Sequence, residues 1–240
     1  MESSKIGLNT KDHWELVGTR TWKTFKWILV HCIKYYHSEE PISTIVDLGC
    51  GNGEFLETCA HFGIPAIGID AEKDALITCQ SKGLSVKETN MSSDQLPFAD
   101  NSISIVVCSQ LIEHLEKKDG IHLMNEVYRI LKNNGLVLIY SPSYYNRSGR
   151  TMPFHLHCWK PNDLKHELAT IGFGGLRFLF APMNWIHFLT YKPKQFVRVT
   201  NRKPNLFERF LNFLVTGFYI LTKLSFLSAN TSFVGYKIKK

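Results

Sequence analysis

The fold of this chain is decided by the stretch Ile45-Val46-Asp47-Leu48-Gly49-Cys50-Gly51-Asn52-Gly53. Apolar residues lead straight into three glycines at alternate positions, and a helical pattern over residues 55–62 follows. An apolar run, glycines and then a helical period predict a strand, a tight turn and a helix. Glycine tolerates positive φ and lets a ligand approach the backbone closely, and the free amides at the helix start face that ligand. The stretch therefore predicts a ligand-binding turn at the end of a strand.

The spacing of the glycines narrows the kind of ligand. A dinucleotide-binding fingerprint reads G-x-G-x-x-G and holds a pyrophosphate on the helix amides. This chain reads G-x-G-x-G, and Asp47 stands two residues before the first glycine. A carboxylate at that position suits a cationic ligand better than a pyrophosphate.

The sequence around the turn alternates short apolar runs with helical patterns. Strands are expected near 44–48, 65–69, 84–88, 103–108, 135–141, 176–180 and 232–237, and helices near 12–37, 53–62, 72–82, 119–133 and 161–171. This alternation predicts an α/β fold with a doubly wound, mostly parallel, Rossmann-like sheet that is covered on both faces. Ligands of such sheets bind at the carboxyl ends of the strands, so the glycine turn, Asp70, Asn90 and residues 109–114 should surround one crevice.

Five ordered segments resemble the class I S-adenosylmethionine-dependent methyltransferases, over roughly residues 40–175. These segments are the glycine turn with Asp47, the strand 66–70 that ends in Asp70, the run 96–107 that begins Leu96-Pro97-Phe98, the segment 112–115 with Glu113-His114, and the helical run 126–135. Within the family, the chain is most similar to the quinone-biosynthesis O-methyltransferase and methyltransferase type 11 group. The resemblance implies a seven-stranded sheet with an N-terminal helix, and it implies S-adenosylmethionine as the cofactor.

The same resemblance assigns roles to residues of the donor site. In the family, the acid at the position of Asp70 binds the ribose hydroxyls, a task that suits a carboxylate. Asn90 stands where many relatives have an Asp that accepts from the adenine amino group, and Met91 is expected on the adenine face. The cofactor-binding residues that we expect are Asp47, Gly49, Cys50, Gly51, Gly53, Asp70, Ala71, Asn90, Met91, Ser109 and Gln110.

Histidines follow the fourth and fifth expected strands. Methyl transfer from a sulfonium mainly needs alignment and exclusion of water, and a hydroxyl acceptor must also lose a proton to a base. His114 is the leading base, because histidine titrates near neutral pH; the alternative is a structural histidine at the strand end. Glu113 is expected to orient His114. His155 and His157 are further catalytic candidates, which would point to one side if their segment is extended.

A divalent metal is an alternative use of these side chains. Two subfamilies that the chain resembles, the quinone-biosynthesis O-methyltransferases and the small-RNA 2′-O-methyltransferases, carry a further Glu three residues before the position of Glu113, as part of a metal site. This chain has Gln110 there, and an amide is a weaker, uncharged ligand for a hard cation. A metal held by Glu113, His114 and His157 stays open, but we expect no metal.

The net charge of +7 is concentrated in the last third of the chain, where residues 160–240 hold 13 Lys/Arg and 3 Asp/Glu residues. This asymmetry indicates an anionic partner surface, either membrane or nucleic acid, or else a solvated basic face. Residues 192–203 are basic, and residues 206–228 are rich in Leu and Phe with a narrow polar stripe. Because its uncharged length runs only from residue 210 to residue 222, the run is too short to span a bilayer. Its composition is that of an interfacial helix, and a packed helix or a homodimer contact is the alternative.

The six cysteines, at positions 32, 50, 59, 79, 108 and 158, contain no C-x-x-C pair. They indicate reduced cytosolic thiols rather than a disulfide set or a zinc site. The N-terminus is polar and shows no apolar signal region. We therefore expect a cytoplasmic protein, with peripheral contact to a membrane as a further hypothesis.

Four parts are expected in the chain: an N-terminal helical lid (1–40), the core that binds S-adenosylmethionine (41–181), a basic and apolar insert (182–230), and the last core strand (231–240). The leading hypothesis is a methyltransferase that acts on a hydroxyl of a small or lipid-linked acceptor. An RNA 2′-O-methyltransferase is the first alternative, disfavoured because the basic residues adjoin a very apolar segment and no glycine-aromatic single-strand motif is present. A non-catalytic scaffold that binds S-adenosylmethionine is the second.

Overall fold

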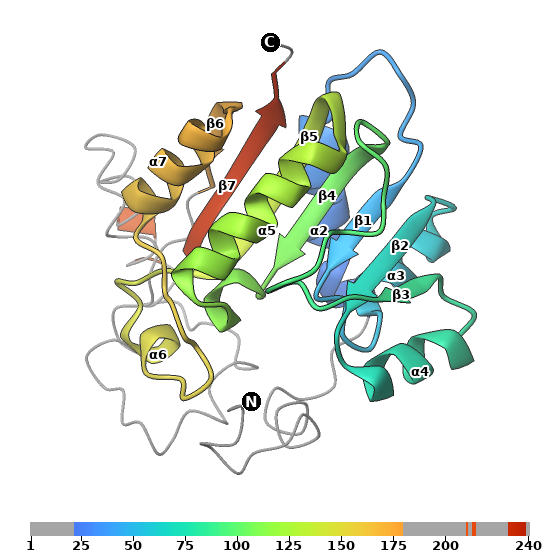
Figure 1. The fold of residues 1–240 in the computed structure, drawn as a ribbon, viewed down its shortest axis with the longest axis horizontal. Coiled ribbons are helices and arrows are strands. Elements are labelled where there is room, and N and C mark those ends of the chain that lie inside the picture. Colours follow the sequence, from blue (N-terminus) through green and yellow to red (C-terminus); the bar gives the residue numbers. More distant parts are fainter. Residues whose placement is uncertain (1–21, 180–209, 211–212, 215–229, 239–240) are drawn as a thin grey trace.

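A computed structural model of the chain describes residues 22–179, 210, 213–214 and 230–238 (Figure 1). These residues form a sheet in the order β3-β2-β1-β4-β5-β7-β6. Its strands are β1 (Ile45–Leu48), β2 (Ala66–Asp70), β3 (Val86–Glu88), β4 (Ile103–Ser109), β5 (Leu131–Pro142), β6 (Phe173–Phe178) and β7 (Asn230–Lys237). The helices are α2 (Trp22–Tyr35), α3 (Glu54–His61), α4 (Lys73–Ser81), η1 (Ile112–His114), α5 (Lys117–Ile130), α6 (Arg147–Arg150) and α7 (Pro161–Ile171).

The sheet is parallel except at β7, which runs antiparallel between β5 and β6. Leu48 at the end of β1 is in register with Ile69 of β2 and with Cys108 of β4. The carboxyl ends of the central strands therefore meet at one edge of the sheet, and the segments that leave this edge include the glycine turn and η1. This architecture confirms the α/β, doubly wound prediction.

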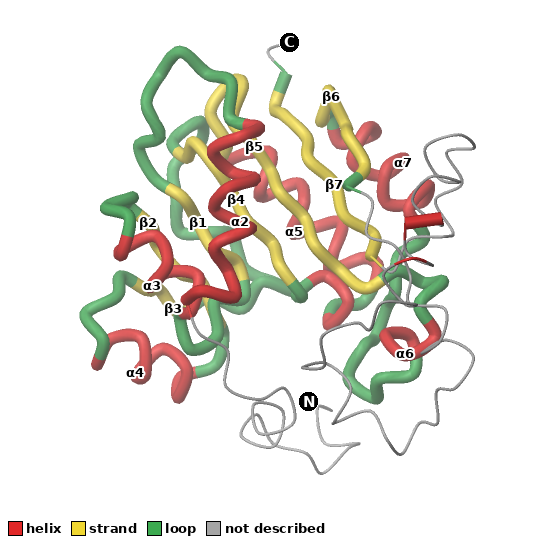
Figure 2. The backbone as a smooth tube through the Cα atoms, turned by 180° about the vertical axis from the view of Figure 1, so that it is seen from behind, coloured by secondary structure: helices red, strands yellow, loops and turns green. Residues whose placement is uncertain are grey.

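Alternating residues of the strands build two cores. Val46, Val106 and Val137 face α5 and α7, and these helices lie in front of the sheet in Figure 1. Ile45 and Ile105, one position away, face α2 and α3, and Figure 2 shows α2 lying across this opposite face. Both cores are built from the same strands, because successive side chains of a strand point to opposite faces of the sheet. Each fully buried Ile or Leu contributes about 1.5–3 kcal/mol.

The helix expected over residues 12–37 is present in its described part as α2. Ile28, Leu29 and Cys32 are buried against the sheet, so this part of the helix packs on the core. The expectation of a lid over residues 1–40 rests mainly on residues outside the described range.

The expected strand 176–180 begins earlier than predicted, at Phe173. Gly172 ends α7 with φ of 122°, and β6 starts at the next residue. The two glycines at 174 and 175 obscured this start, because they weaken the apolar pattern; the pairing of β6 with β7 shifts register there. Most of the basic and apolar insert lies outside the described residues, except that Phe210, Phe213 and Leu214 are helical and exposed.

Candidate active site

The glycine turn has the local geometry that its sequence predicts. Gly49, Gly51 and Gly53 have φ angles of 70°, 51° and 83°, in the left-handed region that disfavours side chains. Gly53 is also the residue before α3, so the turn feeds directly into the helix N-terminus. A Cβ at Gly49 would lie 3.1 Å from the Leu111 side chain, so both the backbone angle and the available space require glycine there.

Asp70 ties this turn to the end of β2. Its Oδ2 accepts from the Gly51 amide at 2.8 Å, and its Oδ1 accepts from the Glu72 amide at 3.0 Å. The amides of Gly49 and Cys50 both donate to the Ile69 carbonyl, at 2.8 and 3.1 Å. The carboxylate therefore lies beside the glycine backbone at the edge of the sheet. A ligand that carries vicinal hydroxyls would bind these carboxylate oxygens from the open side.

A buried carboxyl group, that of Asp47, lies beneath the turn. Asp47 is 5% exposed, and burial raises its pKa well above the usual range; the nearby charges of Asp70 and Glu54 raise it further. A cation bound at this edge would relieve both the desolvation and the repulsion among the three carboxylates. The donor set therefore fits the sulfonium and ammonium groups of S-adenosylmethionine, and it does not fit a pyrophosphate.

Asn90 and Met91 follow β3 as expected, but their side chains already have partners. Asn90 Oδ1 accepts from the Ser92 amide at 3.2 Å and from the Ser92 hydroxyl at 2.7 Å. A carbonyl oxygen has two lone pairs, so accepting from an adenine amino group requires a change at Ser92. Met91 is 5% exposed and packs in the core with Leu48 and Ile69. The adenine-binding roles of both residues stay predictions, as does the role of exposed Ala71.

Gln110 contributes a backbone feature that the sequence did not reveal. Its φ is 57°, which is uncommon for a residue other than glycine, and its amide donates to the Tyr140 carbonyl at 2.7 Å. Strain of this kind clusters at functional sites. This positive φ redirects the chain after half-buried Ser109. The residue after Gln110, Leu111, packs on Gly49 and leads into η1. Gln110 therefore lies between the glycine turn and the next group of site residues.

Backbone hydrogen bonds join η1 to the segment that follows α6. The Glu113 carbonyl accepts from the Leu156 amide at 2.8 Å and from the His157 amide at 3.2 Å. The His114 amide donates to the Leu111 carbonyl at 2.9 Å. These bonds bring two segments, about 40 residues apart in sequence, to the same edge as the glycine turn.

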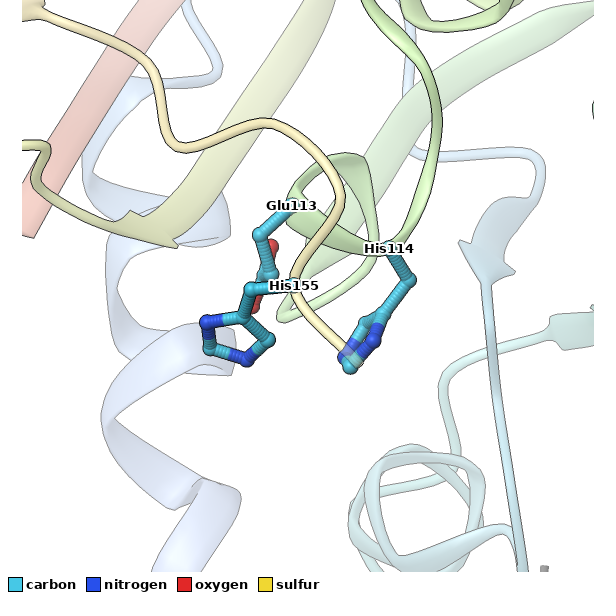
Figure 3. A group of neighbouring side chains, drawn as sticks. All are labelled: Glu113, His114 and His155. Atoms are coloured by element: carbon cyan, nitrogen blue, oxygen red, sulfur yellow. The ribbon is translucent and has the colours of Figure 1, made fainter. Parts of the chain in front are cut away.

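The junction gathers Glu113, His114 and His155, which Figure 3 shows converging from η1 and from the later segment. One carboxylate oxygen and one ring nitrogen from each histidine all lie within 4.8 Å of one another. The rings of His114 and His155 meet edge to face with centroids 4.9 Å apart, and Phe154 stacks on His114 at 5.5 Å. Three of the four candidate catalytic residues, which follow the fourth and fifth strands in the chain, therefore form one cluster.

Glu113 is the buried member of this cluster, with no exposed surface. Among the described residues, neither of its carboxyl oxygens has a partner with hydrogen-bond geometry, and the nearby Ser141 hydroxyl also lacks one. Burial raises the pKa of Glu113 to about 8, although its own backbone amide and the Ser141 hydroxyl act in the opposite direction. A carboxyl group with such a pKa exchanges protons near neutral pH, as catalytic acids and bases require.

Two carbonyl oxygens set the tautomers of the histidines. Nδ1 of His114 lies 3.1 Å from the Phe154 carbonyl oxygen, and Nδ1 of His155 lies 2.7 Å from the Gly149 carbonyl oxygen. A carbonyl oxygen can only accept, so Nδ1 donates and carries the proton in each ring. In the neutral rings the lone pair is then on Nε2, which makes this atom the base.

His157 does not join the cluster, which corrects the expectation that His155 and His157 point to one side. Its ring packs edge to face on Trp159, with centroids 4.6 Å apart. The side chains diverge because the segment is not extended: the His155 amide closes a turn onto the Met152 carbonyl, and the chain bends at Leu156. Among the described residues, the metal-compatible group contains His155 instead of His157.

Comparison with known proteins identifies the domain that carries this site. Residues 46–139 match the "Methyltransferase domain" family. Residues 46–139 of this chain form a methyltransferase domain. The methyltransferase domain is 29% identical to a "Probable S-adenosylmethionine-dependent methyltransferase" of Mycobacterium tuberculosis, over 54% of this chain and 48% of the relative. It is 32% identical to the ubiquinone biosynthesis O-methyltransferase of Methylococcus capsulatus, over 43% of this chain and 44% of the relative.

The methyltransferase fold extends beyond the matched residues. A structure of a SAM-dependent methyltransferase from Archaeoglobus fulgidus superposes with a TM-score of 0.64 at 22% identity, and covers 90% of this chain and 95% of the other. The chain spans about half the length of the curated relatives it matches. Among the described residues, no helix combines the length and apolar character that crossing a bilayer requires.

Proposed function

We propose that the protein transfers the methyl group of S-adenosylmethionine to a hydroxyl of a small or lipid-linked acceptor. The observation that carries this proposal is the cluster of Glu113, His114 and His155, whose polar atoms lie within 4.8 Å of one another. The cluster is connected to the glycine turn through Leu111, so a base stands beside the donor site. The similarity to an enzyme named for O-methylation in ubiquinone biosynthesis supports a hydroxyl acceptor.

The residues of the donor edge would hold the cofactor by charge and shape. When bound, S-adenosylmethionine supplies a methyl group that is already activated by the positive sulfur. Asp70 is placed to accept from the ribose hydroxyls, and the positive φ of Gly51 keeps side chains away from the ligand. Asp47 stabilises positive charge from beneath the turn. Binding and orientation of the donor thus need no residue from the segment that follows β5, which supplies His155.

The acceptor chemistry falls to His114. Nε2 of His114 takes the proton from the acceptor hydroxyl as the oxygen attacks, because Nδ1 is held as a donor by the Phe154 carbonyl. The carboxyl of Glu113 lies next to the imidazolium that forms, and its pKa of about 8 lets it pass a proton to the ring of His155 when that positive charge arises. His155 completes the group as a second ring within reach of the proton. Exclusion of water by Phe154 would favour this exchange.

A membrane surface is the partner that we propose for the C-terminal part. The described part of the insert exposes apolar side chains, with Phe210 57%, Phe213 72% and Leu214 48% exposed. Basic residues at 192–203 precede them in the sequence. Apolar and basic groups together favour binding at an anionic lipid interface, which would bring a lipid-linked acceptor to the enzyme.

Label transfer tests the function directly. The purified protein is incubated with S-adenosylmethionine carrying a tritiated methyl group and with three extracts: water-soluble metabolites, lipids and RNA. We expect label in the metabolite or lipid extract, as a methyl ether that resists alkali, and less label with His114→Ala. Label in RNA would favour the 2′-O-methyltransferase. No label in any extract from protein that binds the donor would favour the scaffold. Omitting metal and adding a chelator should leave the label unchanged if the cluster acts by proton transfer.

A further inference from the structure

Two cysteines from different elements meet beneath the glycine turn. Cys50 lies in the turn itself, and Cys79 lies near the end of α4. Both sulfurs contact the carbonyl oxygen of Gly51: Cys79 Sγ donates to it at 3.2 Å, and Cys50 Sγ lies 3.8 Å from it. The two thiols are therefore neighbours at the carbonyl of Gly51, the residue whose own amide donates to Asp70.

The two sulfurs occupy space that glycines leave open. A Cβ on Gly68 would lie 2.6 Å from Cys50 Sγ, and a Cβ on Gly53 would lie 2.9 Å from Cys79 Sγ. Cys50 is 5% exposed and Cys79 has no exposed surface, and they share a small apolar cluster with Leu56 and Leu76. The packing holds the thiols together.

The surroundings make the two thiols unequal. The pKa of Cys79 is lowered, first by a hydrogen bond from the Cys50 thiol and then by the charge of Lys82. Lys82 is fixed there, because its Nζ donates to the Asn52 carbonyl at 2.8 Å and pairs with Glu57 at 2.7 Å. The pKa of Cys50 is raised by the same hydrogen bond and by burial. Cys79 is thus the thiol that ionises more readily, and Cys50 the one that retains its proton.

We propose that Cys50 and Cys79 form a redox modification site, at which oxidation to a disulfide turns off binding of the methyl donor. The proposal rests on the donor site assigned above, and for these two cysteines it departs from the expectation of thiols that stay reduced. The oxidant is hydrogen peroxide.

The reaction balances with two thiols and one peroxide. The Cys79 thiolate attacks one oxygen of hydrogen peroxide, so an S–O bond forms and the O–O bond breaks. The departing hydroxide takes the proton that the Cys79 thiol released and becomes water. Cys50 then attacks the Cys79 sulfur, so the S–S bond forms, the S–O bond breaks, and hydroxide leaves with the Cys50 proton as a second water. Two thiols lose two electrons in total, and the peroxide gains them.

The disulfide would reshape the donor turn. An S–S bond is about 2.05 Å long, shorter than any non-bonded contact of two sulfurs, so Cys50 must move toward α4. Cys50 is flanked by Gly49 and Gly51, which have φ angles of 70° and 51°. Movement of Cys50 therefore changes the backbone of both glycines and so the shape of the turn. Oxidation also removes the S–H group that donates to the Gly51 carbonyl. The Gly51 amide, which lies 2.8 Å from Asp70 Oδ2, is displaced as a result.

Calorimetry with S-adenosylhomocysteine tests the proposal on the full chain. The protein is titrated reduced, after treatment with hydrogen peroxide, and again after dithiothreitol. We expect at least a tenfold loss of affinity on oxidation and full recovery on reduction. Cys79→Ser and Cys79→Ala should keep their affinity through peroxide treatment. Cys59→Ala, which alters another buried thiol on α3, should lose affinity on oxidation as the wild type does.

Peptide mapping identifies the bond. Without reduction, trypsin should release residues 35–73 joined to residues 74–82. The first peptide also holds Cys59, so the joined pair must persist in Cys59→Ala. Absence of this pair, or a pair whose formation leaves affinity within twofold, overturns the proposal. Failure of the reduced wild type to bind S-adenosylhomocysteine overturns instead the donor site on which the proposal rests.

Discussion

The two halves that we propose for the site, a donor half and an acceptor half, lie on one edge of the sheet but are built in different ways. The donor half is local, because Asp47 and the glycines lie within seven residues and Asp70 reaches Gly51 from a neighbouring parallel strand. The acceptor half joins Glu113 and His114 to His155 through a loop that no strand pairing fixes. From this difference we infer that donor binding depends on local backbone geometry, whereas catalysis depends on packing between segments that are distant in sequence. The two functions should therefore be separable by mutation.

The largest expected effect breaks the donor half alone. Gly51→Val forces a β-branched residue into a left-handed conformation and places its side chain where the ligand approaches. We expect affinity for S-adenosylhomocysteine to fall at least 100-fold, as measured by calorimetry. Gly63→Val is the matched control, since Gly63 has φ of 67° and open space around it. If Gly51→Val binds as well as Gly63→Val, the donor is not held at this turn.

Removal of His114 should break the acceptor half alone. His114→Ala should lower turnover by about 10²–10⁴-fold, the usual contribution of a general base. Donor affinity should stay within a few-fold, because the donor contacts lie elsewhere. His157→Ala serves as the matched control, because its ring packs on Trp159 outside the cluster. Turnover that drops equally in both variants would mean that the loop has lost its fold, and unchanged turnover in His114→Ala would make His155 the next base to test.

The buried carboxyl group of Glu113 allows the acceptor half to be tested through the pH dependence of the free energy of unfolding. The pKa of Glu113 rises from 4.5 in the unfolded chain to about 8 in the fold, so between these pH values the folded state holds a proton that the unfolded state lacks. The free energy of unfolding therefore falls as pH rises through this window, by up to about 1.4 kcal/mol per pH unit. Glu113→Gln should reduce this slope, as measured by urea unfolding at pH 5, 6.5 and 8 with a chelator present. Exposed Glu116→Gln should keep the wild-type slope; equal slopes in all three proteins would contradict the burial argument.

The smallest expected effect concerns the insert, which follows the residues of both halves in the sequence. Replacement of Arg198, Arg202 and Lys203 by Gln should weaken co-sedimentation with anionic liposomes mainly at low salt, because each basic residue contributes about 1 kcal/mol that salt screens. A second variant, with Ser at exposed Phe210, Phe213 and Leu214, should bind less at every salt concentration. Both variants should bind the donor normally. Wild-type protein that stays in the supernatant would remove the support for a lipid-linked acceptor.

The sequence predicted most of the fold and the backbone geometry of the glycine turn, because each signal is local. Apolar alternation located the central strands, and the glycines at 49, 51 and 53 predicted the turn that the structure contains. Asp70 was expected at this edge because it ends the strand next to β1. Once the strand order of a doubly wound sheet is assumed, such local motifs suffice to position their residues in space.

The acceptor half could be predicted only as a set of candidates. The sequence could not separate His155 from His157, since a turn closed by Met152 and a bend at Leu156 decide which ring faces Glu113. The complete burial of Glu113 also depends on the later segment, which packs over η1. The sequence shows Gln110, Cys50 and Cys79 but predicts neither the strain at Gln110 nor the contact between the two cysteines. Both features arise from contacts between distant elements.

A crystal structure of the protein with S-adenosylhomocysteine bound would test the central claim most directly. We predict that the ribose hydroxyls lie on the carboxylate of Asp70 and that the sulfur points toward Nε2 of His114, with room for one hydroxyl group between them. This result would place the donor and the base on opposite sides of a single acceptor position, as direct displacement requires. A sulfur directed away from the cluster of Glu113, His114 and His155, or a nucleoside bound away from the glycine turn, would contradict the claim that the two halves form one active site.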